Sequence, residues 1–368
     1  MWTVAAMTAT EAEAQLSVGY YEFKKTGAEY TGQLKRGKPN GNGRTIYKNG
    51  DIYEGEYVKG KRDGEGTFMS SQGERYVGLW TEDMKNGHGT YYFTNNNMYK
   101  GMWVNDFQEG EGVMEYFNGD MYSGHWSRNK RNGEGKYVWA GGAEYTGSWK
   151  DDLKNGKGIM SWGDGSSYEG DWKNGMREGK GVFVYVNGDK YNGDWKDDMQ
   201  HGKGTYFFHN GERYTGDYMY GERTGVGVYT YPNGDEYVGH FKNGKQEGMG
   251  TFKWANGAEY NGEWKDNKRN GNGVYIWANG DVYEGMWKNN MAEGHGVLKT
   301  QKGDVYEGNF ARGKENGKGV ITEPDGTRFE GTFKNGLKDG EFVEKNSAGK
   351  ITRKGSYRNG RLLEEIKM

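Results

Sequence analysis

An aromatic residue returns every 23 residues through most of this chain, and no other feature of the sequence restricts its fold as strongly. We count each recurrence as position 0 of a repeat. Glycine then stands at position 2, an aromatic residue at position 4 in all repeats but the first, and glycine at positions 11 and 13, with Phe342 the only exception at position 13. Such internal repetition is typical of solenoids and related arrays. The position-0 residues are Tyr30, Tyr53, Tyr76, Tyr99, Tyr122, Tyr145, Tyr168, Tyr191, Tyr214, Tyr237, Tyr260, Tyr283, Tyr306 and Phe329.

The spacing within a repeat predicts a β-hairpin. Positions 0, 2 and 4 share one face of a strand, and positions 11, 13, 15 and 17 share one face of the next strand. Turns separate the strands, as in NGMRE (174–178) and NGDK (187–190), because Asn-Gly and Asp-Gly pairs favour tight hairpins. Glycines between the rings leave bare backbone on which a ring can lie. We therefore predict an all-β fold, an elongated single-layer antiparallel β-meander whose core is a face of stacked aromatic rings.

The chain outside the regular repeats is irregular. Fourteen 23-residue units occupy residues 30–351, and residues 19–29 resemble the second half of an incomplete leading unit. Residues 1–18 form an N-terminal extension in which TEAE favours a short capping helix over residues 10–17. Residues 352–368 hold a degenerate trailing repeat and a tail with apolar residues at helical spacing. We expect this tail to cap the sheet or, by slight preference, to pair with a second copy in an antiparallel dimer through Leu362, Leu363, Ile366 and Met368.

Composition excludes several classes of function. The 50 Lys and Arg residues nearly balance the 52 Asp and Glu residues, which argues against a nucleic-acid partner. The chain has no cysteine, so that disulfides and thiolate metal sites are impossible. No apolar run approaches the roughly 20 residues of a membrane-spanning helix, and Glu11 and Glu13 stand where a secretory signal would be apolar. We expect a cytoplasmic protein.

No catalytic or cofactor site is recognisable in the sequence. The Gly-x-Gly pairs begin a strand, whereas a nucleotide-binding loop would leave a strand and open a helix. Acidic residues recur with the repeat, as on a solvated face, and the histidines lack metal-binding spacing. We predict no enzymatic activity, no cofactor and no metal site within one chain, and a site shared between chains stays open. The histidines are His88, His125, His201, His209, His240 and His295.

The aromatic face is the first candidate surface for a partner. It is either only the core of a one-layer sheet or also a groove in which a peptide or helix lies. Its representative residues are Tyr76, Trp80, Trp103, Trp126, Trp149, Trp172, Trp195, Trp264 and Trp287.

A basic edge is the second candidate surface. Basic residues collect at the first turn of several repeats, and acidic residues collect at the second turn. The pattern is either ordinary turn polarity or an edge that meets anionic lipid or the acidic surface of tubulin. Asp83, Asp152 and Asp198 lie in the same first turns and weaken the second interpretation. The basic residues are Lys59, Lys61, Arg62, Arg128, Lys130, Arg131, Lys265, Lys268 and Arg269.

The stretch YEGDWKNGMREGKGVFVYVNGDK (168–190) resembles a MORN (membrane occupation and recognition nexus) repeat, and the resemblance covers about residues 19 to 360. The chain is similar to the all-MORN scaffolds of protist cytoskeletons and, less completely, to MORN proteins of axonemal radial spokes. The resemblance implies a non-catalytic scaffold, often a homodimer, that holds cytoskeletal or axonemal proteins at a cilium, flagellum or cell cortex. The alternative is a peripheral membrane module that binds anionic phospholipid through its basic edge.

Overall fold

The computed structural model describes residues 15–368, and all regular secondary structure in these residues is β-strand. The chain divides into two compact units, with the boundary between Met176 and Arg177. The all-β fold class is therefore confirmed. The capping helix expected over residues 10–17 lies mostly outside the described residues, and Ser17 is the first residue of a strand.

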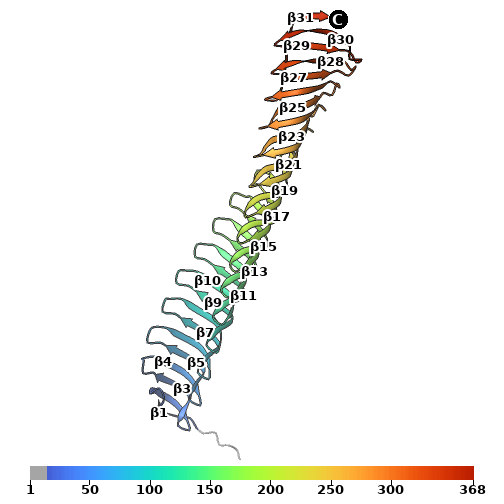
Figure 1. Cartoon of the computed structure of the whole chain (residues 1–368). Coiled ribbons are helices and arrows are strands. Elements are labelled where there is room, and N and C mark those ends of the chain that lie inside the picture. Colours follow the sequence, from blue (N-terminus) through green and yellow to red (C-terminus); the bar gives the residue numbers. More distant parts are fainter. Residues whose placement is uncertain (1–14) are drawn as a thin grey trace, which may run out of the picture. The chain divides into compact units, whose positions relative to one another are not determined.

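In the first unit, each strand pairs antiparallel with the next strand along the chain, so that the unit is a β-meander (Figure 1). Its strands are β1 (Ser17–Phe23), β2 (Ala28–Lys35), β3 (Lys38–Ile46), β4 (Ile52–Val58), β5 (Lys61–Met69), β6 (Arg75–Thr81), β7 (Met84–Tyr92), β8 (Met98–Val104), β9 (Phe107–Glu115), β10 (Met121–Ser127), β11 (Lys130–Val138), β12 (Glu144–Lys150), β13 (Leu153–Ser161) and β14 (Ser167–Lys173).

The second unit is a meander of the same kind, and its first strand begins one residue before the boundary. Its strands are β15 (Met176–Val184), β16 (Lys190–Lys196), β17 (Met199–Phe207), β18 (Arg213–Met219), β19 (Glu222–Thr230), β20 (Glu236–Lys242), β21 (Lys245–Lys253), β22 (Glu259–Lys265), β23 (Lys268–Ile276), β24 (Val282–Lys288), β25 (Met291–Lys299), β26 (Val305–Ala311), β27 (Lys314–Thr322), β28 (Arg328–Lys334), β29 (Leu337–Lys345), β30 (Ile351–Arg358) and β31 (Arg361–Lys367).

The second strand of each hairpin begins three residues earlier than the sequence predicts. In the stretch 174–178, taken as a turn, only Asn174 and Gly175 lie between strands, and both have positive φ, as a two-residue hairpin turn requires. Position 17, expected at the end of the second strand, instead begins the second turn. Tyr185 is an example, because its carbonyl accepts a hydrogen bond from the Gly188 amide at 2.9 Å.

Because the second strand starts early, it has extra residues relative to its partner strand. A β-bulge at the position-11 glycine accommodates them. Between β12 and β13, Trp149 pairs with Lys154 and Gly147 with Gly158, so the register shifts between the two pairs. Gly156 lies in this bulge with φ of 100°, a conformation that a residue with a Cβ adopts only with strain.

The core is a ladder of aromatic rings on one face of the sheet. Tyr145 is fully buried, and its ring contacts Trp149 of the same repeat at 5.1 Å and Trp172 of the next at 5.5 Å, both edge to face. The Tyr145 hydroxyl donates to the Ser148 carbonyl at 3.0 Å, and the Trp149 indole N–H donates to the Gly135 carbonyl at 3.1 Å. The polar ends of these two rings are thus satisfied by backbone, which allows their burial without an aliphatic core.

The trailing repeat keeps the aromatic face by means of an extra residue. The register between β29 and β30 shifts so that Glu344 pairs with Arg353 and Lys345 with Ile351, which leaves Thr352 between the pairs. This bulge returns Tyr357 to the aromatic face, where its ring lies 5.0 Å from that of Phe342. The helical spacing of the tail was misleading, because residues 361–367 form strand β31, paired with β30.

Candidate interaction surfaces

The predicted aromatic face is closed and forms the core of each unit. The nine residues chosen to represent it are at most 7% exposed, so their rings are almost completely covered. They are Tyr76, Trp80, Trp103, Trp126, Trp149, Trp172, Trp195, Trp264 and Trp287. Burial raises the pKa of the position-0 tyrosines, as at Tyr145, where Glu134 adds to the effect. These tyrosines are therefore neutral core residues.

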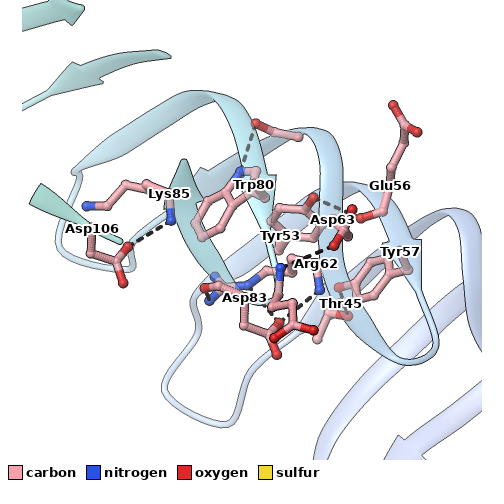
Figure 2. A network of polar contacts seen from close by, with 12 residues as sticks. Thr45, Tyr53, Glu56, Tyr57, Arg62, Asp63, Trp80, Asp83, Lys85 and Asp106 are labelled. Carbon is pink, nitrogen blue, oxygen red and sulfur yellow. Dashed lines mark hydrogen bonds and ion pairs between the residues drawn. The ribbon is translucent and has the colours of Figure 1, made fainter. Parts of the chain in front are cut away.

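Long side chains at position 9 cover the rings, a role that the sequence analysis missed. Figure 2 shows Arg62 beside Trp80, with its guanidinium carbon 4.1 Å from the centre of the indole ring. The Arg62 Nε lies 3.3 Å from Asp83 Oδ1, and an Arg62 Nη donates to the Asp83 carbonyl at 2.6 Å. Asp83 belongs to the first turn of the next repeat, so the arginine joins two hairpins while it shields the tryptophan.

The same arrangement recurs along each unit. Arg131 lies 4.4 Å above Trp149 and forms an ion pair of 3.1 Å with Asp152. Arg269 lies 4.5 Å above Trp287 and donates to the Asn290 carbonyl at 3.0 Å. Position 9 shares a face with position 4 because the two residues pair across the two-residue turn, as Trp126 and Arg131 do. A two-residue turn in place of the predicted longer one would therefore have placed these arginines on the aromatic face.

The predicted basic edge is therefore divided. Arg62, Arg131 and Arg269 do not belong to it, since their side chains lie on the aromatic face. Lys61 and Lys130 remain exposed at the first turn and form ion pairs of 3.4 Å and 3.3 Å with Glu82 and Asp151 of the next repeat.

The other four residues of the predicted basic edge also lie at or beside the first turns. Lys59 and Arg128 occupy turn positions with positive φ, and their amides donate to Asn40 and Glu109. Lys265 ends strand β22 and Lys268 begins β23. Acids and amides alternate with these cations, so the edge has mixed charge.

Acidic residues at the second turn tie successive repeats together. Asp189 is the most buried of them, and its carboxylate accepts hydrogen bonds of 2.8 Å from the Tyr206 hydroxyl and the His209 amide. The His209 ring Nδ1 also lies 2.8 Å from Asp189 Oδ1. Burial alone would raise the pKa of Asp189, but these hydrogen bonds, with one from the Asn187 side chain, lower the pKa to about 2. The carboxylate thus stays charged and holds two turns together.

Edge strand β31 carries the residues that were expected to contact a second copy. Leu362, Leu363, Ile366 and Met368 are 41%, 54%, 57% and 61% exposed. Because β31 pairs only with β30, its outer edge presents unpaired backbone groups among the residues described.

Two searches of residues 15–368 were negative. No cluster of three histidine or carboxylate side chains forms a possible metal site there. Nor does any helix in this part of the chain have the length and apolarity needed to cross a membrane.

The chain belongs to the MORN repeat family. The family model matches fourteen consecutive segments, at residues 30–52, 53–75, 76–98, 99–121, 122–144, 145–167, 168–190, 191–213, 214–236, 237–259, 260–282, 283–305, 306–328 and 329–341. Each matched segment begins at a position-0 aromatic residue, and no enzyme family is indicated. Among curated proteins, none matches the chain.

Solved structures show only distant similarity. The TCP domain of SAS-4 (dCPAP) from Drosophila melanogaster, in complex with a proline-rich motif of Ana2 (dSTIL), is 18% identical, with 42% of this chain and 85% of that chain covered and a TM-score of 0.28. The TCP10 domain of Danio rerio CPAP is 11% identical, with 63% and 98% covered and a TM-score of 0.25. A streptogramin B lyase is 12% identical, with 81% and 92% covered and a TM-score of 0.13. Similarities at this level carry no argument about function.

Proposed function

We propose that this chain is a non-catalytic scaffold that organises a cytoskeletal assembly, at an axoneme or the cell cortex, through contacts with other proteins. The observation that supports the proposal is that the two faces of the sheet differ in how much their residues vary between repeats. Repeating residues are buried in the aromatic face, whereas the opposite face carries side chains that change from repeat to repeat. Equivalent positions lie two strands apart, about 9 to 10 Å. Each unit therefore presents a regular array of variable side chains on a repeating frame.

The exposed edge of β31 supports a homodimer as part of this proposal. Two copies of one edge strand pair antiparallel about a two-fold axis, which is the commonest symmetry of protein oligomers. Leu363→Lys with Ile366→Lys would place new charges on this strand. Light scattering should then show a fall from twice the chain mass to the single mass, and a single mass for the unaltered protein would contradict the dimer.

Binding to anionic phospholipid through the basic edge is the alternative function. This alternative is weakened because Lys61 and Lys130 form ion pairs and the three arginines lie on the aromatic face, so that five of the nine residues of the predicted basic edge do not present a free cation to lipid.

Detergent extraction of cells that express the tagged full-length chain tests the scaffold against lipid binding. A scaffold should remain with the insoluble cytoskeleton after membranes dissolve and resist increased salt. Release by detergent alone, together with salt-sensitive binding of the purified protein to phosphatidylserine vesicles, would favour the membrane module.

A further inference from the structure

On the face opposite the rings, the backbones of the glycines at positions 2 and 13 form the floor of shallow hollows. Side chains at positions 1, 3, 12 and 14 form the walls. In the first unit the walls are mainly polar. One hollow is lined by Glu54, Glu56, Glu65 and Thr67 with Val77 and Leu79, and another by His88, Thr90, Lys100, Glu111 and Ser123 with Val113.

In the second unit, a hollow of about 990 Å³ over strands β21 to β25 has more apolar side chains in its wall, beside the polar residues Glu259, Asn261, Asn272, Glu284 and His295. Met249 and Met286 are 53% and 49% exposed, so about half of each flexible side chain faces solvent. The remaining apolar wall consists of Val274, Ile276 and Val297.

The repeat frame does not require these methionines. Position 12 carries a polar residue in every repeat except two adjacent ones, which carry Val226 and Met249. Asn272 occupies position 12 in the repeat after that of Met249. Asn309 occupies position 3 in the repeat after that of Met286, and the strands pair in the same way. Met249 therefore departs from the usual polar position 12, and Met286 joins Leu79 and Met102 as an apolar residue at position 3, whereas valine is common at position 14. Exposed apolar side chains that gather on one face mark binding surfaces.

Acidic groups lie in the wall of the hollow and beside it. Glu263 and Glu284 are exposed on strands β22 and β24. Glu259 lies 4.0 Å from Lys253, and Glu307 lies 4.0 Å from the Nε2 of His295. The wall of the hollow itself contains Glu259 and Glu284 and no lysine or arginine, which favours a basic partner.

We propose that this hollow binds an amphipathic helix of a partner protein, with lysine or arginine beside its apolar stripe; the proposal rests on the scaffold function above. The hollow lies on a sheet face, where backbone pairing by an added strand is not available. It crosses the strands, and equivalent walls recur every two strands, about 9.5 Å. Seven residues of a helix, about two turns, rise about 10.5 Å, which is close to this spacing. Side chains two turns apart on the helix can therefore contact equivalent walls in successive repeats.

A designed peptide tests the site on the full-length protein. The probe is a fluorescent helical peptide about three heptads long, with leucine at the a and d positions and lysine at the positions beside them. A control peptide has glutamate in place of lysine. Anisotropy should show binding of the lysine peptide and at least tenfold weaker binding of the glutamate peptide. Equal binding of the two would overturn the proposal.

Asparagine substitutions locate the site, because the chain itself carries asparagine at these repeat positions. Met249→Asn with Met286→Asn should weaken binding of the lysine peptide about tenfold, with unchanged circular dichroism. The control Leu79→Asn alters the polar hollow of the first unit and should change binding less than about twofold. Equal losses in the two variants, or no loss in the double variant, would reject the site.

Other occupants give different results. If Met249→Asn with Met286→Asn lowers the mass measured by light scattering, the hollow pairs two copies and the proposal is wrong. It is also wrong if the double variant loses binding to neutral lipid vesicles that the unaltered protein has. Failure of the peptide test leaves the extraction experiment unaffected, so the hollow and the scaffold function are judged separately.

Discussion

The ring of Tyr145 lies directly against the Cα of Gly158, so closely that a Cβ at position 158 would overlap the phenol. Tyr145 and Gly158 belong to the paired strands β12 and β13, and Gly147 pairs with Gly158 beneath the ring. The glycines therefore form the site into which the tyrosine packs. The last repeat supports this coupling, because Phe342 replaces the position-13 glycine only where Phe329 replaces the tyrosine, and the two rings stack at 5.2 Å.

We expect Gly158→Ala to destabilise this hairpin by about 2 to 4 kcal/mol, because either the ring or the strand must move. Hydrogen exchange of the β12 and β13 amides measures this local loss of protection. Gly141→Ala is the matched control, since a Cβ at Gly141 meets nothing within 4 Å and its φ is not in the left-handed range. An equal effect of the two substitutions would contradict the packing explanation.

Removal of the Tyr145 hydroxyl should partly restore the stability that Gly158→Ala removes. Tyr145→Phe with Gly158→Ala should lose less protection than the sum of the two single changes, because the overlapping oxygen is gone. Strict additivity would show that the tyrosine and the glycine act independently.

Trp126 and Trp103 differ in the hydrogen bonding of the indole, and Lys85 also lies 4.5 Å from the centre of the Trp103 ring. The Trp126 indole N–H donates to the Gly112 carbonyl at 3.2 Å, whereas the buried Trp103 indole N–H has no partner among the described residues. Both indoles are nearly buried. Trp126→Phe should therefore cost about 1 kcal/mol more than Trp103→Phe in unfolding free energy, measured with urea. Equal costs would mean that the hydrogen bond adds nothing to the packing.

The aromatic face was predictable from the sequence because its period is strict and its glycines and rings alternate on one face. The strand boundaries were not predictable from the sequence. The two-residue turns need positive φ at both residues, and residues other than glycine occupy them. Asp151 and Asp152 form such a turn with φ of 47° and 69°. The bulge at position 11 then places Arg131 over Trp149, a contact that depends on the pairing of strands and that charge spacing alone assigned to the edge.

The arginine over the tryptophan should stabilise the sheet more than its exposed neighbour does. Arg131→Gln should cost about 1 to 2 kcal/mol, because it removes the cation from the ring and the ion pair with Asp152 while glutamine retains some packing, as Gln108 does at the same position. Lys130→Gln breaks only the exposed pair with Asp151 and should cost less than about 0.5 kcal/mol. The free energy of unfolding of both variants, measured with urea, tests this prediction. A larger loss for Lys130→Gln than for Arg131→Gln would contradict the stabilising role of the arginine over the tryptophan.

Asp189 should make the second unit sensitive to acid. Burial opposes ionisation, but hydrogen bonds from His209, Tyr206 and Asn187 lower the pKa of Asp189 to about 2, below the unfolded value of about 4. A group with a lowered folded pKa contributes its full stability above the unfolded pKa and loses it as the pH falls through the folded value. Protection of the β16 and β17 amides should thus decline between about pH 4 and pH 2.

Asp189→Asn separates the charge from the hydrogen bonds. Asparagine can still accept from the His209 amide, as Asn97 accepts from the Phe117 amide at 3.0 Å in another repeat. The variant should therefore fold, with lower stability at pH 7 and a smaller loss of protection of the same amides towards pH 2. An acid response unchanged by the substitution would assign it to other carboxylates, such as Asp194, whose pKa is also lowered: burial raises it, but the Lys180 ammonium and the Lys203 amide outweigh that effect.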